Sequence, residues 1–194
     1  MKNVIKKYTF DNYITEENWQ KYLKEKALKF IDENDKWFFI GGQSGSGKTH
    51  LCTAVCGEFL KMNKSVFYML WISDCKDLKN TINDYEKHNE LLRNYRESEV
   101  LYIDDFLKNG KEKDENIQPP TPADIQLAYD ILNFRYNNPN LITIISSERM
   151  LSDIMDIDEA AAGRIYERAD SGKYILNIKK DRSRNFRTKN YIEI

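Results

Sequence analysis

The sequence lacks several features that would each point to a different class of protein. It has no apolar run long enough to cross a membrane, and its first residues lack the apolar core of a secretory signal. Its net charge is only −1, so it has no overall basic field and any nucleic-acid site would have to be a local patch. Its three cysteines have no metal-ligand spacing. We therefore expect a protein of the reducing cytoplasm with no membrane partner.

The pattern of apolar residues predicts one α/β domain over the 194 residues. Short apolar runs alternate with segments of helical periodicity, which is typical of a parallel sheet with helices on both faces. The expected strands are 36–40, 65–71, 100–105, 141–145 and 174–178. The expected helices are 16–33, 50–61, one from residue 73, a short one near Leu91, one from residue 121, 150–155 and 158–169. The predicted architecture is a three-layer α/β/α sandwich with a five-stranded, mainly parallel sheet.

Several residues are expected to fix the ends and faces of these helices. Thr15 and Ser73 have side chains typical of N-caps, and the helix after Ser73 would have Ile82 and Tyr85 at apolar positions. Residues 121–124, Thr-Pro-Ala-Asp, combine an N-cap with a proline at the first helical position and an acid at the third.

Residues 42–49 read Gly-Gln-Ser-Gly-Ser-Gly-Lys-Thr and match the phosphate-binding loop G-x-x-x-x-G-K-[ST], the Walker A motif. An ordinary glycine-rich turn is the alternative, but the apolar strand before the match and the helix after it favour the motif. The glycines let several backbone N–H groups point at one phosphate, and the helix N-terminus adds partial positive charge. Lys48 would reach the β- and γ-phosphates and the Thr49 hydroxyl would hold Mg²⁺, so ATP and Mg²⁺ are the expected ligands. The predicted nucleotide-binding residues here are Gly42, Gln43, Ser44, Gly45, Ser46, Gly47, Lys48, Thr49 and His50.

An acidic pair ends the third apolar run. Residues 100–105 read Val-Leu-Tyr-Ile-Asp-Asp, which is the Walker B form. A buried parallel strand delivers the carboxylates at its C-terminal end to the edge of the sheet where nucleotides bind. Asp104 would hold Mg²⁺ through water, and Asp105 would orient or deprotonate the attacking water. A strand that simply ends in a polar turn is the alternative.

Over essentially its whole length the chain resembles the ATPase domain of the DnaC/DnaI-like replicative helicase loaders, within the AAA+ class of P-loop NTPases. The motifs that carry the resemblance are Tyr-Thr-Phe-Asp-Asn-Tyr at 8–13, Gly-Lys-Thr-His-Leu at 47–51, Tyr-Ile-Asp-Asp-Phe at 102–106, Ile-Ile-Ser-Ser-Glu at 144–148 and Gly-Arg-Ile-Tyr-Glu-Arg at 163–168. The last motif and the Asp-Asp pair narrow the resemblance to loaders of phage and prophage type. The ATPase motifs begin near residue 8, so we expect a single domain over 1–194, without the loaders' N-terminal helicase-binding domain and without a C-terminal helical lid.

The resemblance implies contacts for the base and for the last phosphate of ATP. The N-terminal segment 1–14 would flank the adenine, with Phe10 and Tyr13 as contacts. Ser147, or its neighbour Ser146, would be the sensor I group near the γ-phosphate. The serine pair could also simply end a strand.

The resemblance also implies two arginines that act on ATP. Arg164 would be the arginine finger, which reaches the ATP site of the next subunit, so that self-association would complete the site. A surface salt bridge is the alternative for Arg164. Arg184 would be the sensor II arginine, with Arg187 as the runner-up. The basic tail 179–194 could instead be a solvated edge or touch DNA phosphates.

The function implied by the resemblance is ATP binding and slow hydrolysis by a module that loads a replicative DNA helicase onto single-stranded DNA. The helical insertion 73–97 would face the single-stranded DNA. Three alternatives remain: an IstB-like transposition helper ATPase, a small P-loop kinase, and a nucleotide-binding switch without useful hydrolysis. The pair Asp104 and Asp105 favours hydrolysis, because a pure binder does not need the second acid.

Overall fold

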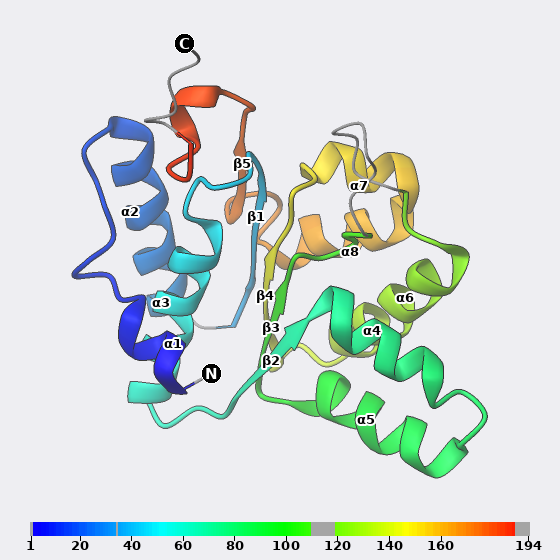
Figure 1. Ribbon diagram of the computed structural model, residues 1–194. Helices are drawn as coiled ribbons and strands as arrows, with labels where there is room; N and C mark the ends of the chain where they lie inside the picture. Colours follow the sequence, from blue (N-terminus) through cyan, green and yellow to red (C-terminus); the bar gives the residue numbers. More distant parts are fainter. Residues whose placement is uncertain (1, 34, 110–118, 189–194) are drawn as a thin grey trace.

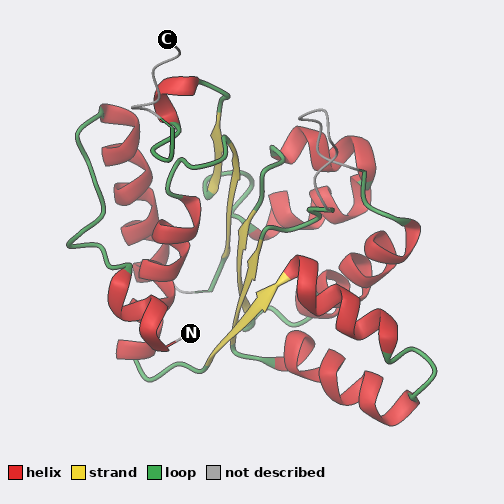
Figure 2. Ribbon diagram, in the orientation of Figure 1, coloured by secondary structure: helices red, strands yellow, loops and turns green. Residues whose placement is uncertain are grey.

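The computed structural model describes residues 2–33, 35–109 and 119–188. Five strands form one sheet in the order β2-β3-β4-β1-β5, and all four pairings are parallel (Figures 1 and 2). The strands are β1 (Trp37–Gly42), β2 (Val66–Leu70), β3 (Val100–Asp104), β4 (Ile142–Ser146) and β5 (Ile175–Ile178). The predicted parallel sheet is confirmed, and only β4 separates β1 from β3. The C-terminal ends of these two strands therefore lie close together at one edge of the sheet.

Helices cover both faces of this sheet, so the predicted three layers are confirmed (Figure 1). On one face lie α1 (Lys2–Lys7), α2 (Asn18–Glu33) and α3 (Lys48–Lys61). On the other face lie α4 (Trp71–Asn80), α5 (Tyr85–Glu97), α6 (Pro122–Tyr136), α7 (Leu151–Ile157) and α8 (Glu159–Arg168). In the described residues after β5, the only helix is a short 3-10 turn at Arg182–Arg184. No described helix is both long and apolar enough to span a membrane.

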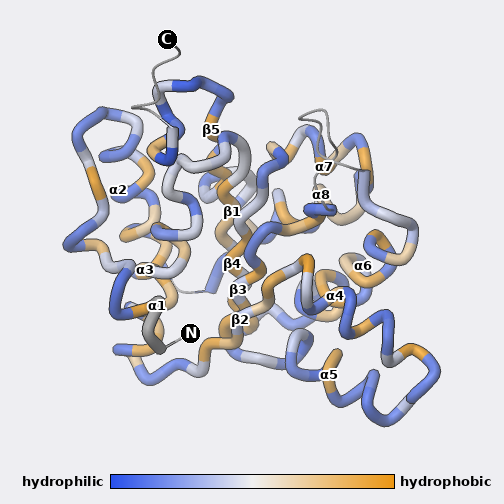
Figure 3. Tube along the Cα trace, in the orientation of Figure 1, coloured by the Kyte–Doolittle hydropathy of each residue, from blue (hydrophilic) through white to orange (hydrophobic). Residues whose placement is uncertain are grey.

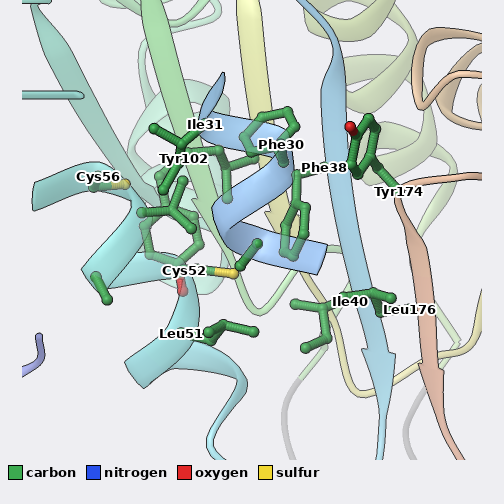
Figure 4. Close-up of a cluster of buried hydrophobic side chains, with 14 of the residues drawn as sticks. Phe30, Ile31, Phe38, Ile40, Leu51, Cys52, Cys56, Tyr102, Tyr174 and Leu176 are labelled. Atoms are coloured by element: carbon green, nitrogen blue, oxygen red, sulfur yellow. The ribbon is translucent and has the colours of Figure 1, made fainter. Parts of the chain in front are cut away.

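Each face of the sheet has its own apolar core. Under α2 and α3, the rings of Phe30 and Phe38 lie with centroids 5.1 Å apart, and Tyr174 lies 5.4 Å from Phe30 (Figure 4). Cys52 and Cys56 are free thiols buried in the same cluster. Figure 3 shows hydrophobic residues concentrated along the strands, with hydrophilic residues on the outer helices. Packing from both sides therefore holds the strands, and with them the strand ends that carry the site.

Arg135 in α6 is a fully buried arginine that joins three elements. Its guanidinium donates to the carbonyl oxygens of Tyr95 (3.2 Å), Arg96 (3.0 Å), Ser98 (2.8 Å) and Ile142 (2.6 Å) and to the hydroxyl of Thr143 (2.9 Å). The last carbonyls of α5 have no partner inside their own helix, so Arg135 caps that helix and ties it to β4. Burial, together with the charge of Arg168, lowers the pKa of the Arg135 guanidinium.

The start of α2 differs from the prediction, whereas the start of α6 agrees with it. α2 begins at Asn18, and Thr15 does not cap it. Instead, the Gln20 side chain accepts from the backbone N–H of Glu17 at 2.7 Å and closes the first turn. The capping box predicted in residues 121–124 is present in full.

The prediction for α4 was wrong at both ends. The helix follows β2 without a gap, so Ser73 lies inside its first turn and donates to the Leu70 carbonyl. The helix ends at Asn80, and a separate helix, α5, begins at Tyr85. Ile82 and Tyr85 are therefore 69% and 81% exposed instead of buried. The predicted insertion 73–97 corresponds to the hairpin formed by α4 and α5. The last part of the predicted basic tail, 189–194, lies outside the described residues.

Candidate nucleotide-binding site

The predicted phosphate loop connects the end of β1 to the start of α3. Gly42, Gly45 and Gly47 have φ angles of 104°, 71° and 87°, in the left-handed region that side chains disfavour. A β-carbon on Gly42 would overlap the carbonyl oxygen of Ile178 at the end of β5. The loop therefore needs these glycines both for its own turn and for the close approach of β5. It places backbone N–H groups at the N-terminus of α3, where they favour an anion.

The loop forms one wall of a cleft of about 430 Å³. The cleft lies outside the C-terminal ends of the parallel strands, which is where such sheets bind ligands. Its lining from the loop and from the end of β3 consists of Ser44, Gly45, Ser46, Gly47, Lys48, Thr49, His50, Asp104 and Asp105. The other lining residues are Tyr8, Tyr13, Ile14, Gln20, Lys108, Glu148, Phe186 and Arg187. Gly42 and Gln43 are not lining residues, but their carbonyl oxygens accept hydrogen bonds from Lys48, which lines the cleft.

Lys48 lies along the floor of the loop. Its Nζ donates to the carbonyl oxygens of Gly42 (2.9 Å) and Gln43 (2.7 Å), and the residue is buried. Burial lowers the pKa of Lys48 to about 8, although the charges of Glu148 and Asp105 oppose that shift. Polyphosphate oxygens in the cleft would offer this ammonium stronger acceptors than neutral carbonyls.

Asp104 ends β3 and accepts hydrogen bonds from four hydroxyl groups. Its Oδ1 accepts from Thr49 Oγ1 (3.2 Å), from Tyr102 OH (2.8 Å) and from Ser146 Oγ, and its Oδ2 accepts from Tyr68 OH (3.1 Å). Burial, together with the charge of Asp104, raises the pKa of Tyr68, so this phenol stays a hydrogen-bond donor. The sequence motifs predicted that Thr49 and Asp104 lie together. The motifs did not predict that the two tyrosines donate hydrogen bonds to Asp104.

Thr49 and Asp104 fit the predicted magnesium ion. A hydroxyl and a carboxylate side by side are the ligands that Mg²⁺ takes from a protein when phosphate oxygens and water complete its shell. The described residues contain no cluster of three or more His, Cys, Asp or Glu that would form an all-protein metal site. The donor set therefore suits a metal that arrives with a nucleotide.

Asp105 leaves the strand with a positive φ of 57°. Its Oδ2 lies 3.1 Å from Lys108 Nζ, and the same nitrogen lies 2.9 Å from Glu148 Oε1. Sequence reasoning missed both Lys108 and Glu148. Their positions in the sequence could have indicated both residues. Lys108 follows the acidic pair by three residues, and Glu148 directly follows the serines at the end of β4.

The N-terminal segment also lines the cleft. Tyr13 is among the lining residues, and its ring lies edge-on to His50 with centroids 5.2 Å apart. Tyr8 also lines the cleft and lies 4.9 Å from the His50 ring. Phe10, by contrast, is not a lining residue and belongs to the core under α2 and α3. Tyr8 and Tyr13, and not Phe10, therefore present aromatic surface to a base.

The structure separates the two serines at the end of β4, of which Ser147 or its neighbour Ser146 was predicted as the sensor I group. Ser147 is fully buried, and its hydroxyl donates to the Phe106 carbonyl (2.8 Å) and accepts from the Arg149 N–H (3.1 Å). Ser146 is the serine that reaches the acidic site, through its bond to Asp104. Ser147 therefore holds the chain after β3 in place and does not face the cleft.

The two tail arginines, Arg184 and its runner-up Arg187, also differ in where they lie. Arg187 lines the cleft, whereas Arg184 does not. The Arg184 guanidinium lies 5.7 Å from the centre of the Trp19 ring. The tail is joined to the phosphate loop because the Phe186 N–H donates to the Gly45 carbonyl at 3.0 Å.

Arg164 lies on α8, away from the cleft of its own chain. Its guanidinium lies 4.9 Å and 5.7 Å from the ring centres of Tyr129 and Tyr136, and it donates to the Ala160 carbonyl at 2.9 Å. It forms no ion pair within the described part of the chain, so the salt-bridge alternative finds no support. Its role as an arginine finger stays a prediction.

A parallel sheet in this strand order, with a glycine loop after β1 and an acidic pair after β3, defines a P-loop protein with the AAA+ fold. The family model of the bacterial DnaA ATPase domain matches residues 4–167, and the chain belongs to this family.

Relatives by sequence include phage and replication proteins. Protein YqaM of Bacillus subtilis (strain 168) is 33% identical over 192 residues, 92% of this chain and 57% of YqaM. The phage-like element PBSX protein XkdC of the same strain is 36% identical over 141 residues, 71% of this chain and 48% of XkdC. The replicative helicase loader DnaC of Escherichia coli (strain K12) is 29% identical over 113 residues, 56% of this chain and 46% of DnaC. This chain spans about half the length of these relatives. An insertion-sequence protein, of IS232 from Bacillus thuringiensis subsp. berliner, is 25% identical over 83% of this chain and 60% of its own length.

Solved structures share the fold. AMPPCP-bound DnaA from Aquifex aeolicus superposes with a TM-score of 0.68 at 21% identity, over 94% of this chain and 53% of that one. The DnaC helicase loader superposes with a TM-score of 0.62 at 23% identity, over 90% of this chain and 96% of that one. Together with the family match, these likenesses confirm the resemblance to the AAA+ domains of helicase loaders.

Proposed function

We propose that this chain binds ATP with Mg²⁺, hydrolyses it slowly, and uses that cycle to load a replicative DNA helicase onto single-stranded DNA. The observation that carries the proposal is the convergence of Lys48, Thr49, Asp104 and Asp105 in one cleft at the C-terminal edge of the sheet. The kinship with DnaA and DnaC supports an ATPase at the level of the family.

The four side chains divide the chemistry among them. Lys48 exchanges its two carbonyl partners for β- and γ-phosphate oxygens. Thr49 and Asp104 hold Mg²⁺, which neutralises charge on the phosphates. Asp105 orients the attacking water. Tyr8 and Tyr13, which line the same cleft, flank the base.

Asp105→Asn separates binding from chemistry. The change keeps the size of the side chain and removes its charge. We expect unchanged MgATP affinity by isothermal titration and hydrolysis reduced on the order of a hundredfold, which is typical for loss of a general base. Asp156→Asn, at an exposed position on α7, is the matched control and should hydrolyse ATP at the wild-type rate. Wild-type hydrolysis by Asp105→Asn would remove Asp105 from the reaction.

We also propose that Arg164 acts on the ATP site of a neighbouring copy, because α8 keeps it away from its own cleft. An arginine at the γ-phosphate stabilises charge that grows in the transition state. Specific ATPase activity should therefore rise with protein concentration. Arg164→Ala and Lys48→Ala should each be inactive, yet their mixture should recover part of the activity where an intact loop meets an intact arginine. No recovery, under conditions in which the wild type assembles, would assign Arg164 a structural role.

The DNA contact is proposed for the hairpin of α4 and α5 and for the basic tail. Lys76 and Lys87 are exposed on the hairpin, whereas Lys79 is paired with Asp124. Binding to single-stranded DNA should be independent of base sequence and should weaken steeply with salt. Lys76→Ala with Lys87→Ala should reduce both the affinity and the salt slope. A salt-independent affinity would argue against phosphate contacts.

The kinship with the IS232 protein favours one second candidate, a helper ATPase in transposition. The two functions differ in the protein that they act on. Loading of a replicative helicase onto a single-stranded circle, followed by strand displacement, tests the first. Stimulation of strand transfer by a transposase encoded beside the gene tests the second.

A further inference from the structure

Lys108 lies at the junction of the phosphate loop, Glu148 and Asp105. Its side chain is 18% exposed, and its Nζ is within 3.1 Å of both carboxylates. Glu148 and Ser44 of the loop line the same cleft. Polar contacts therefore run from Glu148 through Lys108 to Asp105, the acid proposed to orient the attacking water, beside the phosphate loop in one cleft.

The ammonium of Lys108 has capacity for one further acceptor. It has three N–H donors, and its described partners are the two carboxylates. Burial alone would lower its pKa, but the hydrogen bond with Glu148 and the charge of Asp105 raise it, so the group remains a cation. All three side chains line the cleft, so the free donor is available to a ligand there.

The position of Lys108 points to one particular phosphate. Lys48 and the N-terminus of α3 would surround the phosphates of a nucleotide that enters the loop. Lys108 instead extends from the end of β3 on the side of Asp105, where a terminal phosphate would be attacked. Without a cation there, Asp105 and Glu148 would repel that phosphate.

We propose that Lys108 is a second phosphate-binding lysine that contacts the third phosphate of ATP, and that Glu148 holds it between the loop and Asp105. The inference rests on the proposed ATP site. ADP lacks the phosphate in question, so Lys108 makes the cleft discriminate between ATP and ADP. Glu148 limits that discrimination, because its charge offsets the charge of the lysine.

Titration calorimetry of MgATP and MgADP with Lys108→Met tests the proposal. Loss of a charge-assisted hydrogen bond should weaken ATP binding about tenfold and leave ADP binding within about twofold. Glu148→Gln should shift the ratio in the opposite direction, about threefold in favour of ATP, because the amide still accepts from Lys108 but no longer repels phosphate. Lys173→Met is the matched control, because Lys173 also bridges two carboxylates, Glu33 and Asp170, outside the cleft. It should leave both affinities unchanged.

The outcomes separate this inference from the proposed function. A wild-type protein that binds neither nucleotide would overturn the ATP site itself. A wild-type protein that binds ATP while Lys108→Met keeps the same ATP-to-ADP ratio, or weakens both nucleotides equally, would overturn the role of Lys108. If Lys108→Met does not fold in a thermal melt, Glu148→Gln decides alone, and an unchanged ratio in that variant refutes the proposal.

Discussion

Replacing Arg135 with methionine should strongly reduce the free energy of unfolding. Methionine has a similar reach but donates no hydrogen bond, so four buried or partly buried carbonyl oxygens and two hydroxyls lose this donor. At about 1 kcal/mol or more for each unsatisfied carbonyl, the gross loss is about 4 kcal/mol. The variant no longer buries an unpaired charge, which offsets part of that loss. We expect a net loss of about 3 kcal/mol, a large share of the 5–15 kcal/mol that is usual for a domain.

Urea unfolding followed by circular dichroism measures this change. The midpoint should fall while the slope stays constant, because the folded surface is unchanged. Arg93→Met, at an exposed position on α5, is the matched control and should change the stability by less than about 0.5 kcal/mol. A loss below about 1 kcal/mol for Arg135→Met would refute the idea that this arginine caps α5 and ties it to β4.

Three further changes probe other parts of the molecule. Against the effect of burial, bonds to Lys79 and to the α6 N-cap lower the pKa of Asp124, so Asp124→Asn should cost about 1–2 kcal/mol at pH 7. That difference should fade as the pH falls below the ordinary carboxyl pKa of about 4, and urea titrations at pH 7 and pH 3 measure it. Gly45→Val strains a φ of 71° and places its β-carbon against Asn185 of the tail, so nucleotide affinity measured by equilibrium dialysis should fall at least about tenfold. Tyr102→Phe removes one hydroxyl from Asp104, the carboxylate proposed to bind magnesium, so half-maximal ATPase activity should need about threefold more Mg²⁺, and an unchanged requirement would limit Tyr102 to packing.

Local sequence patterns predicted the strands and the phosphate loop because each of these depends on a short, contiguous segment. The failures occurred where the outcome depends on the rest of the fold. The helical pattern from Cys75 continues to Tyr85, yet the chain forms two helices. The missed signal was Asp84, whose side chain accepts from the Lys87 N–H at 3.1 Å and begins α5.

Several site residues were beyond sequence reasoning for a similar reason. Tyr68 lies within β2, Lys108 follows β3 and Glu148 follows β4, and only the sheet order brings them together. The choice between Ser146 and Ser147 depends on the alternation of side chains along β4, which a boundary error of one residue reverses. The positions of Arg184 and Arg187 depend on how the tail crosses the phosphate loop. The tail is irregular, so its sequence has no periodic signal that would predict this path.

The strand order also sets when the cleft can form while the chain is being synthesised. β2 and β3 are consecutive strands in the sequence and pair with each other, whereas β1 pairs with β4 and β5. Trp37 of β1 can therefore pair with Thr143 of β4 only after β4 has been synthesised. A nascent chain therefore carries the phosphate loop on an unpaired strand until most of the domain has left the ribosome. ATP can stabilise only a nearly finished domain, and products that stop before β4 expose the apolar residues of β1 as an open edge that other chains can join.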